Sequence, residues 1–181
     1  MTHRERFIKT LKCEKIGGQV PTFELVFFLT MEAFGKVHPS HRFYEQWNQM
    51  SSRERKLHIE DMADIYIATA KRFDHSAIFI HPNPGDLDST QWLLETIREK
   101  TGDEYYIMMH GDPTWAIPDG DSMMDFAAQM YEEPEVLNEE SKKRLDNSLK
   151  FAAGLDARGH LLDGFALCSD YCFNVNPFFN S

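Results

Sequence analysis

Polar side chains follow the expected strands of this chain, close to where those strands end. His110 could donate a proton to a bound ligand or take one from it, with Asp112 holding the imidazole in one tautomer. Asp170 and Tyr171 follow the last expected strand, where a carboxylate could orient a polar substrate. Structural roles are the alternative: His110 and Asp112 would cap a helix and hold a turn, and Asp170 would form an Asx turn in a surface loop. We treat these four residues as candidates for substrate binding.

Two more candidates belong to other expected strands. Glu24 interrupts an apolar segment, where a buried carboxylate needs a partner or a raised pKa unless its side chain reaches solvent at the strand end. Asn83 lies in a turn rich in proline and glycine. Cys168 and Cys172 lack the second pair that a zinc knuckle needs. The sequence therefore predicts a substrate-binding set, and assigns neither a catalytic residue nor a metal site.

Alternating helices and strands are expected to position these side chains. Two capping boxes, Thr2 with Glu5 and Ser51 with Glu54, open two of the helices, and Ser89 is predicted to cap a third. The apolar pattern predicts helices over 3–12, 52–73, 90–100, 122–132 and from 134 to near 159, and strands over 20–28, 76–80, 105–109 and 165–168. Because strands and helices alternate, we expect an α/β fold with parallel strands and right-handed crossovers.

Two architectures fit this alternation, an open doubly wound sheet and a (β/α)8 barrel. The first expected strand is not followed by a glycine-rich phosphate loop, which argues against a doubly wound fold that binds a nucleotide. A complete barrel takes about 250 residues and eight strands. We therefore expect one partial domain over 1–181, the N-terminal half of a (β/α)8 TIM barrel, truncated after a fourth parallel strand. Its candidate residues would share one mouth at the carboxyl ends of the strands.

Composition narrows the classes of partner. The chain of 181 residues has 19 Lys and Arg against 29 Asp and Glu, a formal net charge of −10, which argues against nucleic acid and anionic membranes as partners. Its three cysteines give no disulfide framework and fit a reducing compartment. The charged N-terminus does not resemble a signal peptide, and no apolar stretch is long enough to span a membrane. We expect a cytoplasmic protein.

Three stretches resemble one known family. The opening residues 2–7 and 11–15 with Val20-Pro21, the segment 163–173 and the closing segment 176–181 are similar to the first half of the uroporphyrinogen decarboxylase family. That family has a (β/α)8 barrel and contains uroporphyrinogen decarboxylases and corrinoid-system methyltransferases. The latter move a methyl group between a methylated corrinoid protein, or a methoxylated donor, and a thiol or pterin acceptor. In this resemblance, Asp170 and Tyr171 match the family's acidic loop residue and its aromatic partner.

Differences between this sequence and the family pattern favour one of the two branches of the family. Decarboxylases carry an arginine-rich motif after the first strand, whereas residues 28–35 contain no arginine and one extra carboxylate, Glu32. Arginine is the usual partner of a polycarboxylate, so the resemblance implies corrinoid-linked methyl transfer. The methyltransferase zinc ligands lie in the second half of the barrel, so zinc and a corrinoid belong to the complete barrel and no cofactor is predicted in this chain.

We therefore expect the chain to be part of an enzyme, and we expect this N-terminal half alone to be inactive. Its expected partners are a small-molecule substrate or a corrinoid protein. Two alternatives remain: uroporphyrinogen decarboxylation, and a non-catalytic half-barrel that assembles with a second half or a second copy through its open edge strands.

Overall fold

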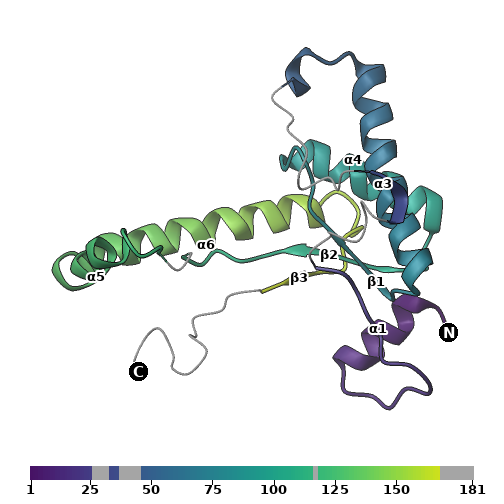
Figure 1. Ribbon diagram of the computed structural model, residues 1–181, viewed down its shortest axis with the longest axis horizontal. Helices are drawn as coiled ribbons and strands as arrows, with labels where there is room; N and C mark the ends of the chain where they lie inside the picture. Colours follow the sequence, from purple (N-terminus) through teal and green to yellow (C-terminus); the bar gives the residue numbers. More distant parts are fainter. Residues whose placement is uncertain (26–32, 37–45, 116–117, 168–181) are drawn as a thin grey trace. The chain divides into compact units, whose positions relative to one another are not determined.

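The computed structural model describes residues 1–25, 33–36, 46–115 and 118–167. It shows a mixed α/β fold in which helices flank a small sheet (Figure 1). The elements are α1 (His3–Leu11), the 3₁₀ helix η2 (Trp47–Gln49), α3 (Ser52–Phe73), β1 (Ala77–Ile80), α4 (Leu87–Thr101), β2 (Tyr106–His110), α5 (Met123–Glu132), α6 (Pro134–Asp156) and β3 (Gly164–Ala166).

The chain divides into two compact units. Unit 1 comprises Met1–Met109 and Gly154–Phe165, and unit 2 comprises His110–Ala153 and Ala166–Ser181. Unit 1 contains the larger core, and unit 2 contains α5 and most of α6.

Capping explains where the helices begin. Both predicted capping boxes form: the Thr2 hydroxyl accepts from the amide of Glu5, and the Ser51 hydroxyl accepts from the amide of Glu54. Helix α3 matches the predicted start and end. Helix α4 begins earlier than predicted, because Asp86 is its N-cap and accepts from the amide of Ser89 at 2.9 Å. The prediction that Ser89 caps this helix is therefore wrong.

Among the described residues, the sheet has three strands in the order β1–β2–β3. β1 pairs with β2 in parallel, with Ala77 opposite Tyr106 and Ile80 opposite Met109. The Asp163 amide donates to the Ile107 carbonyl at 2.9 Å, beside the start of β3. All four side chains of β1 are buried, as expected for a parallel strand covered on both faces.

The predicted strand over 20–28 is not seen, so the described residues do not form the four-stranded half-barrel. Residues 20–25 are irregular, and 26–28 lie outside the described residues. The Thr22 carbonyl accepts from the amides of Ser76 at 2.8 Å and Ala77 at 3.4 Å. Pro21 has no amide hydrogen to donate. Residues 20–25 therefore make backbone hydrogen bonds to the start of β1 through one carbonyl and form no ladder there.

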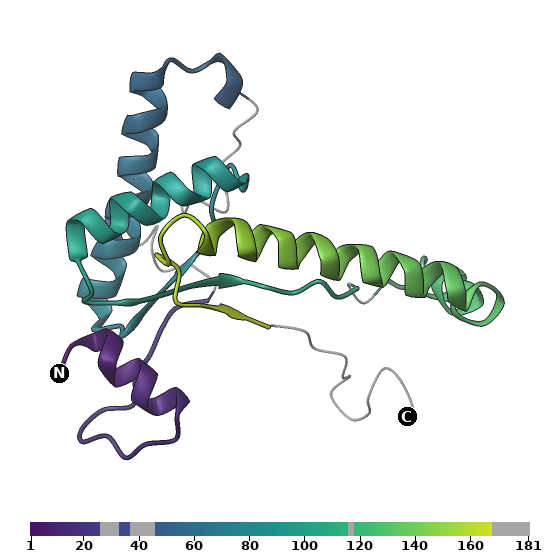
Figure 2. The same ribbon diagram turned by 180° about the vertical axis from the view of Figure 1, so that it is seen from behind.

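The core of unit 1 lies between α3, α4 and the sheet. Helices α3 and α4 lie side by side in both views of the ribbon (Figures 1 and 2). The fully or almost fully buried side chains of the unit 1 core are Ile59, Met62, Tyr66, Ile78, Phe79, Ile80, Leu93, Leu94, Ile97 and Ile107. Met108 and Met109 of β2 are buried in this core too. This core holds the ends of β1 and β2 in fixed register.

Candidate functional site

The described candidates are divided between the two units. Glu24 and Asn83 belong to unit 1, and His110 and Asp112 belong to unit 2. Asp170 and Tyr171, like the Cys168 and Cys172 pair, lie outside the described residues. The common mouth expected from the sequence therefore stays a prediction, and each unit supplies its own local geometry.

Asn83, His110 and Asp112 are placed by the ends of strands. Asn83 lies in the turn after β1, His110 is the last residue of β2, and Asp112 follows two residues later. The amide of Gly111, between His110 and Asp112, donates to the Ala166 carbonyl at 3.0 Å. That bond fixes the backbone of the turn beside the end of β3. His110 is exposed and Asp112 is half-buried.

Tyr66 of α3, which sequence reasoning missed, is hydrogen-bonded to His81, the residue that follows β1. The Tyr66 hydroxyl donates to the His81 carbonyl at 3.1 Å and accepts from the His81 amide at 2.8 Å. The His81 Nε2 lies 3.2 Å from the Leu25 carbonyl. A buried tyrosine needs a partner for its hydroxyl, and this requirement is the signal that could have found Tyr66. These contacts position the turn that carries Asn83.

Glu24 lies in a confined setting. Its Oε2 atom is buried and has no hydrogen-bond partner among the described residues, and burial raises the pKa of its carboxyl. It lines a cavity of about 10 Å³ with Tyr66, Thr69 and His75. Burial also lowers the pKa of His75, more than the nearby Asp74 carboxylate raises it. Small-molecule sites have volumes of about 300–1,000 Å³, so this cavity does not admit an organic ligand.

A charged network in unit 1 centres on Asp163. Its carboxylate accepts from Arg4 at 2.9 and 2.6 Å, from Arg98 at 2.7 Å and from the Ile107 amide at 2.8 Å. Burial alone would raise the pKa of Asp163, but these hydrogen bonds outweigh it and the pKa is lowered. The Tyr106 hydroxyl donates to the Asp163 carbonyl at 3.1 Å.

This network lies at the amino ends of β2 and β3, because Asp163 immediately precedes β3 and Ile107 is the second residue of β2. In parallel α/β folds, ligands bind at the carboxyl ends of the strands. We therefore interpret the Asp163 network as a structural link between α1, α4 and the two strands. Sequence reasoning did not find it, since Arg4 and Asp163 are 159 positions apart.

Within the described residues, no group of three or more His, Cys, Asp or Glu could hold a metal ion. None of the helices in this part of the chain is both long enough and apolar enough to cross a membrane.

Comparisons with models of protein families, with curated proteins and with solved structures give no match for this chain.

Proposed function

We propose that this chain is part of an enzyme of the uroporphyrinogen decarboxylase family, and that it helps to bind the substrate of a corrinoid-linked methyl transfer to a thiol or pterin. The observation that carries the proposal is the strand order, because β1, β2 and β3 are neighbours in chain order. A (β/α)8 barrel has this sequential order throughout, and a doubly wound sheet has it on each side of its ligand-binding crevice, so three strands in this order are compatible with the proposed barrel. The proposal extends the three strands to a half-barrel.

The positions of His110 and Asp112 in unit 2 support a ligand site, and Asn83 has the corresponding position in unit 1. His110 and Asp112 lie at or just beyond the carboxyl end of β2, and Asn83 lies beyond the carboxyl end of β1. A barrel mouth is built from such positions, and they offer an amide, an imidazole and a carboxylate to a polar ligand. The role assigned to this set is binding and orientation of the substrate.

The choice of methyl transfer over decarboxylation rests on charge. The porphyrinogen substrate of a decarboxylase carries many carboxylates, and residues 28–35 offer it no arginine. A chain of net charge −10 also repels a polyanion. Because the described residues contain no metal-ligand group, zinc activation of a thiol is not assigned to them.

Equilibrium dialysis of the purified chain against methylcobalamin tests the proposal by binding, so the chain need not be active alone. We expect the chain to retain methylcobalamin, and we expect His110→Ala to raise its dissociation constant about tenfold, since losing one hydrogen bond to a ligand costs about 1.4 kcal/mol. His160→Ala is the matched control, because His160 is an exposed histidine in the turn after α6. It should bind like the unaltered chain.

Two results would overturn the proposal. One is that methylcobalamin passes freely through the dialysis cell, so that no bound fraction is measured. The other is that carbon dioxide is released from a porphyrinogen mixed with the chain, which would assign decarboxylation in place of methyl transfer.

A further inference from the structure

Unit 2 contains an open hollow whose size suits a small organic ligand. Its volume is about 600 Å³, and small-molecule sites have volumes of about 300–1,000 Å³. The described residues that line it include Trp115, which precedes α5, and Asp125, Phe126, Gln129 and Glu132 of α5. All of these residues belong to unit 2. None of the described residues that line this α5 hollow belongs to the candidate substrate-binding set.

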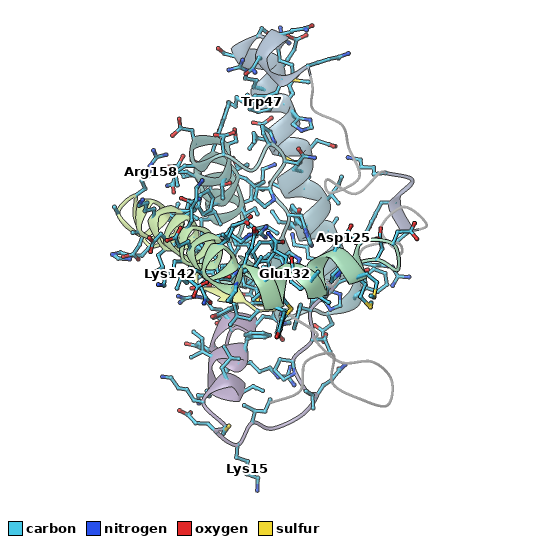
Figure 3. All side chains as sticks on the ribbon, turned by 90° about the vertical axis from the view of Figure 1, so that its left-hand side faces the viewer. Lys15, Trp47, Asp125, Glu132, Lys142 and Arg158 are labelled. Carbon is cyan, nitrogen blue, oxygen red and sulfur yellow. The ribbon has the colours of Figure 1, made fainter. Side chains whose placement is uncertain are left out.

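One face of α5 forms a wall of the α5 hollow. Asp125, Gln129 and Glu132 all line it, and residues spaced by three or four positions lie on the same face of a helix. Figure 3 shows Asp125 and Glu132 on α5. The helix therefore presents carboxylates and an amide to the same space.

Two aromatic rings also line the α5 hollow. The ring centroids of Trp115 and Phe126 lie 5.8 Å apart, and their planes are inclined by 51°. The Trp115 Nε1–H donates to the Ser141 hydroxyl at 2.8 Å, and the guanidinium carbon of Arg144 lies 4.0 Å from the centroid of the Trp115 ring. These contacts with α6 hold the indole in place, and the stacked guanidinium shows that this ring already attracts a cation.

The charge of the α5 hollow favours a cationic ligand. Asp125, Glu132 and Glu133 line it, whereas no Lys or Arg is among its described lining residues. The Arg144 guanidinium beside the indole is paired with the Glu140 carboxylate at 3.2 Å, so its charge is already compensated. An anion would be repelled by the three lining carboxylates, and a neutral ligand would gain nothing from them.

An organic cation fits these residues better than a metal ion does. Within the described part of the chain, no group of three or more His, Cys, Asp or Glu could hold a metal ion. Aromatic rings offer no ligand atoms to a hard metal ion, whereas they attract an ammonium group that lies within about 6 Å of their centroids. The rings also pack against the apolar part of an organic ligand.

We propose that the α5 hollow binds an organic ammonium cation with an apolar body, such as an arylalkylamine or a quaternary ammonium ion. The apolar body packs against the Trp115 and Phe126 rings, and the charged nitrogen lies near the carboxylates of Asp125 and Glu132. This inference goes beyond the proposed function and shares no residue with it. Failure of either one therefore leaves the other standing.

Isothermal titration calorimetry of the purified chain with benzyltrimethylammonium chloride tests the proposal. We expect a dissociation constant of about 1 mM, as for a small ligand with few contacts. It should rise with ionic strength, because salt screens the exposed carboxylates. Neutral benzyl alcohol and anionic benzoate keep the aromatic ring but lack the positive charge, and each should bind about tenfold more weakly or not at all.

Two variants with matched controls separate the charge from the ring. Glu132→Gln should raise the dissociation constant about threefold, and Glu139→Gln should leave it unchanged, because Glu139 is an exposed carboxylate of α6 that does not line the hollow. Phe126→Leu keeps an apolar side chain without the ring and should also raise it about threefold. Its control is Tyr131→Leu, because Tyr131 is 89% exposed and lies outside the lining. Circular dichroism of each variant shows whether the fold is retained.

Four results would overturn the proposal. The first is that benzyltrimethylammonium shows no saturable binding up to about 20 mM, well above the expected constant. The second is that benzyl alcohol or benzoate binds as tightly as the cation. The third is that each variant behaves like its matched control. The fourth is that a trilysine peptide binds and benzyltrimethylammonium does not, which would assign the hollow to a basic protein partner.

Discussion

Replacing Asp163 by Asn tests whether the buried charge network holds unit 1 together. The Asp163 side chain is only 5% exposed and its carboxylate accepts hydrogen bonds from Arg4, Arg98 and the Ile107 amide. Asparagine removes the charge and turns one acceptor oxygen into a donor that faces a guanidinium. Breaking a buried ion pair by changing one partner costs about 3–5 kcal/mol. We expect the low end, about 3 kcal/mol, because the Arg4 side chain is one-third exposed and regains water.

Urea denaturation followed by both circular dichroism and tryptophan fluorescence measures this cost. Coincident transitions justify a single free energy of unfolding, which matters for a chain with two compact units. Asp103→Asn is the control, because Asp103 lies 4.0 Å from the same Arg98 but is 83% exposed. Its removal should cost less than about 0.5 kcal/mol. If Asp163→Asn costs no more than Asp103→Asn, the structural role given to this network is refuted.

Further predictions concern pH, capping and a strand end. The pKa of Asp163 is lower in the folded chain than its usual value, so its stabilisation is present above about pH 4 and is lost as the pH falls through the folded pKa; acid titration should cost the unaltered chain more stability than Asp163→Asn. Asp86→Ala should lower the free energy of unfolding by about 1 kcal/mol, and Ser89→Ala by clearly less, in the same urea assay. Tyr66→Phe should cost about 1–3 kcal/mol, because the backbone groups of His81 lose their partner, and faster hydrogen exchange at the His81 amide would show it.

Local signals in the sequence predict much of the fold. Helix α3 is predicted to the residue, because the Ser51 and Glu54 capping box marks its start and the apolar period continues to its end. The start of α4 is missed, because Asp86 and Ser89 are both good caps and the choice depends on which side chain faces the first turn. Residues 20–25 have strand composition but are irregular, because formation of a strand also requires a ladder of backbone hydrogen bonds to a neighbour.

In helices α5 and α6, the apolar period predicts the helix but not the burial of its apolar side chains. Leu145 and Leu149 lie four positions apart and share a face of α6, as the period predicts, yet their side chains are 46% and 58% exposed. The Met124 side chain of α5 is exposed too, at 77%. The period identifies the apolar face of a helix, and the identity of what covers it depends on tertiary or quaternary contacts.

For the candidate site, the sequence predicts the positions of the polar residues but not their contacts. Placing Asn83, His110 and Asp112 at strand ends needs only the alternation of elements, and their positions follow from the sequence. The contacts around them depend on residues far away in the chain, such as Tyr66 beside His81. Local patterns carry no information on such pairs, so the sequence predicts where the polar groups lie and not how they are held.

Titration of the isotope-labelled chain with methylcobalamin, followed by amide NMR, tests the proposed site and its ligand together. We predict that the amides whose signals shift most are those of His110 and Asp112, at the carboxyl end of β2. The amino-end network at Asp163 should show the smallest shifts. Unchanged spectra at saturating ligand, or shifts concentrated around Asp163, would contradict a corrinoid-linked site at the carboxyl ends of the strands.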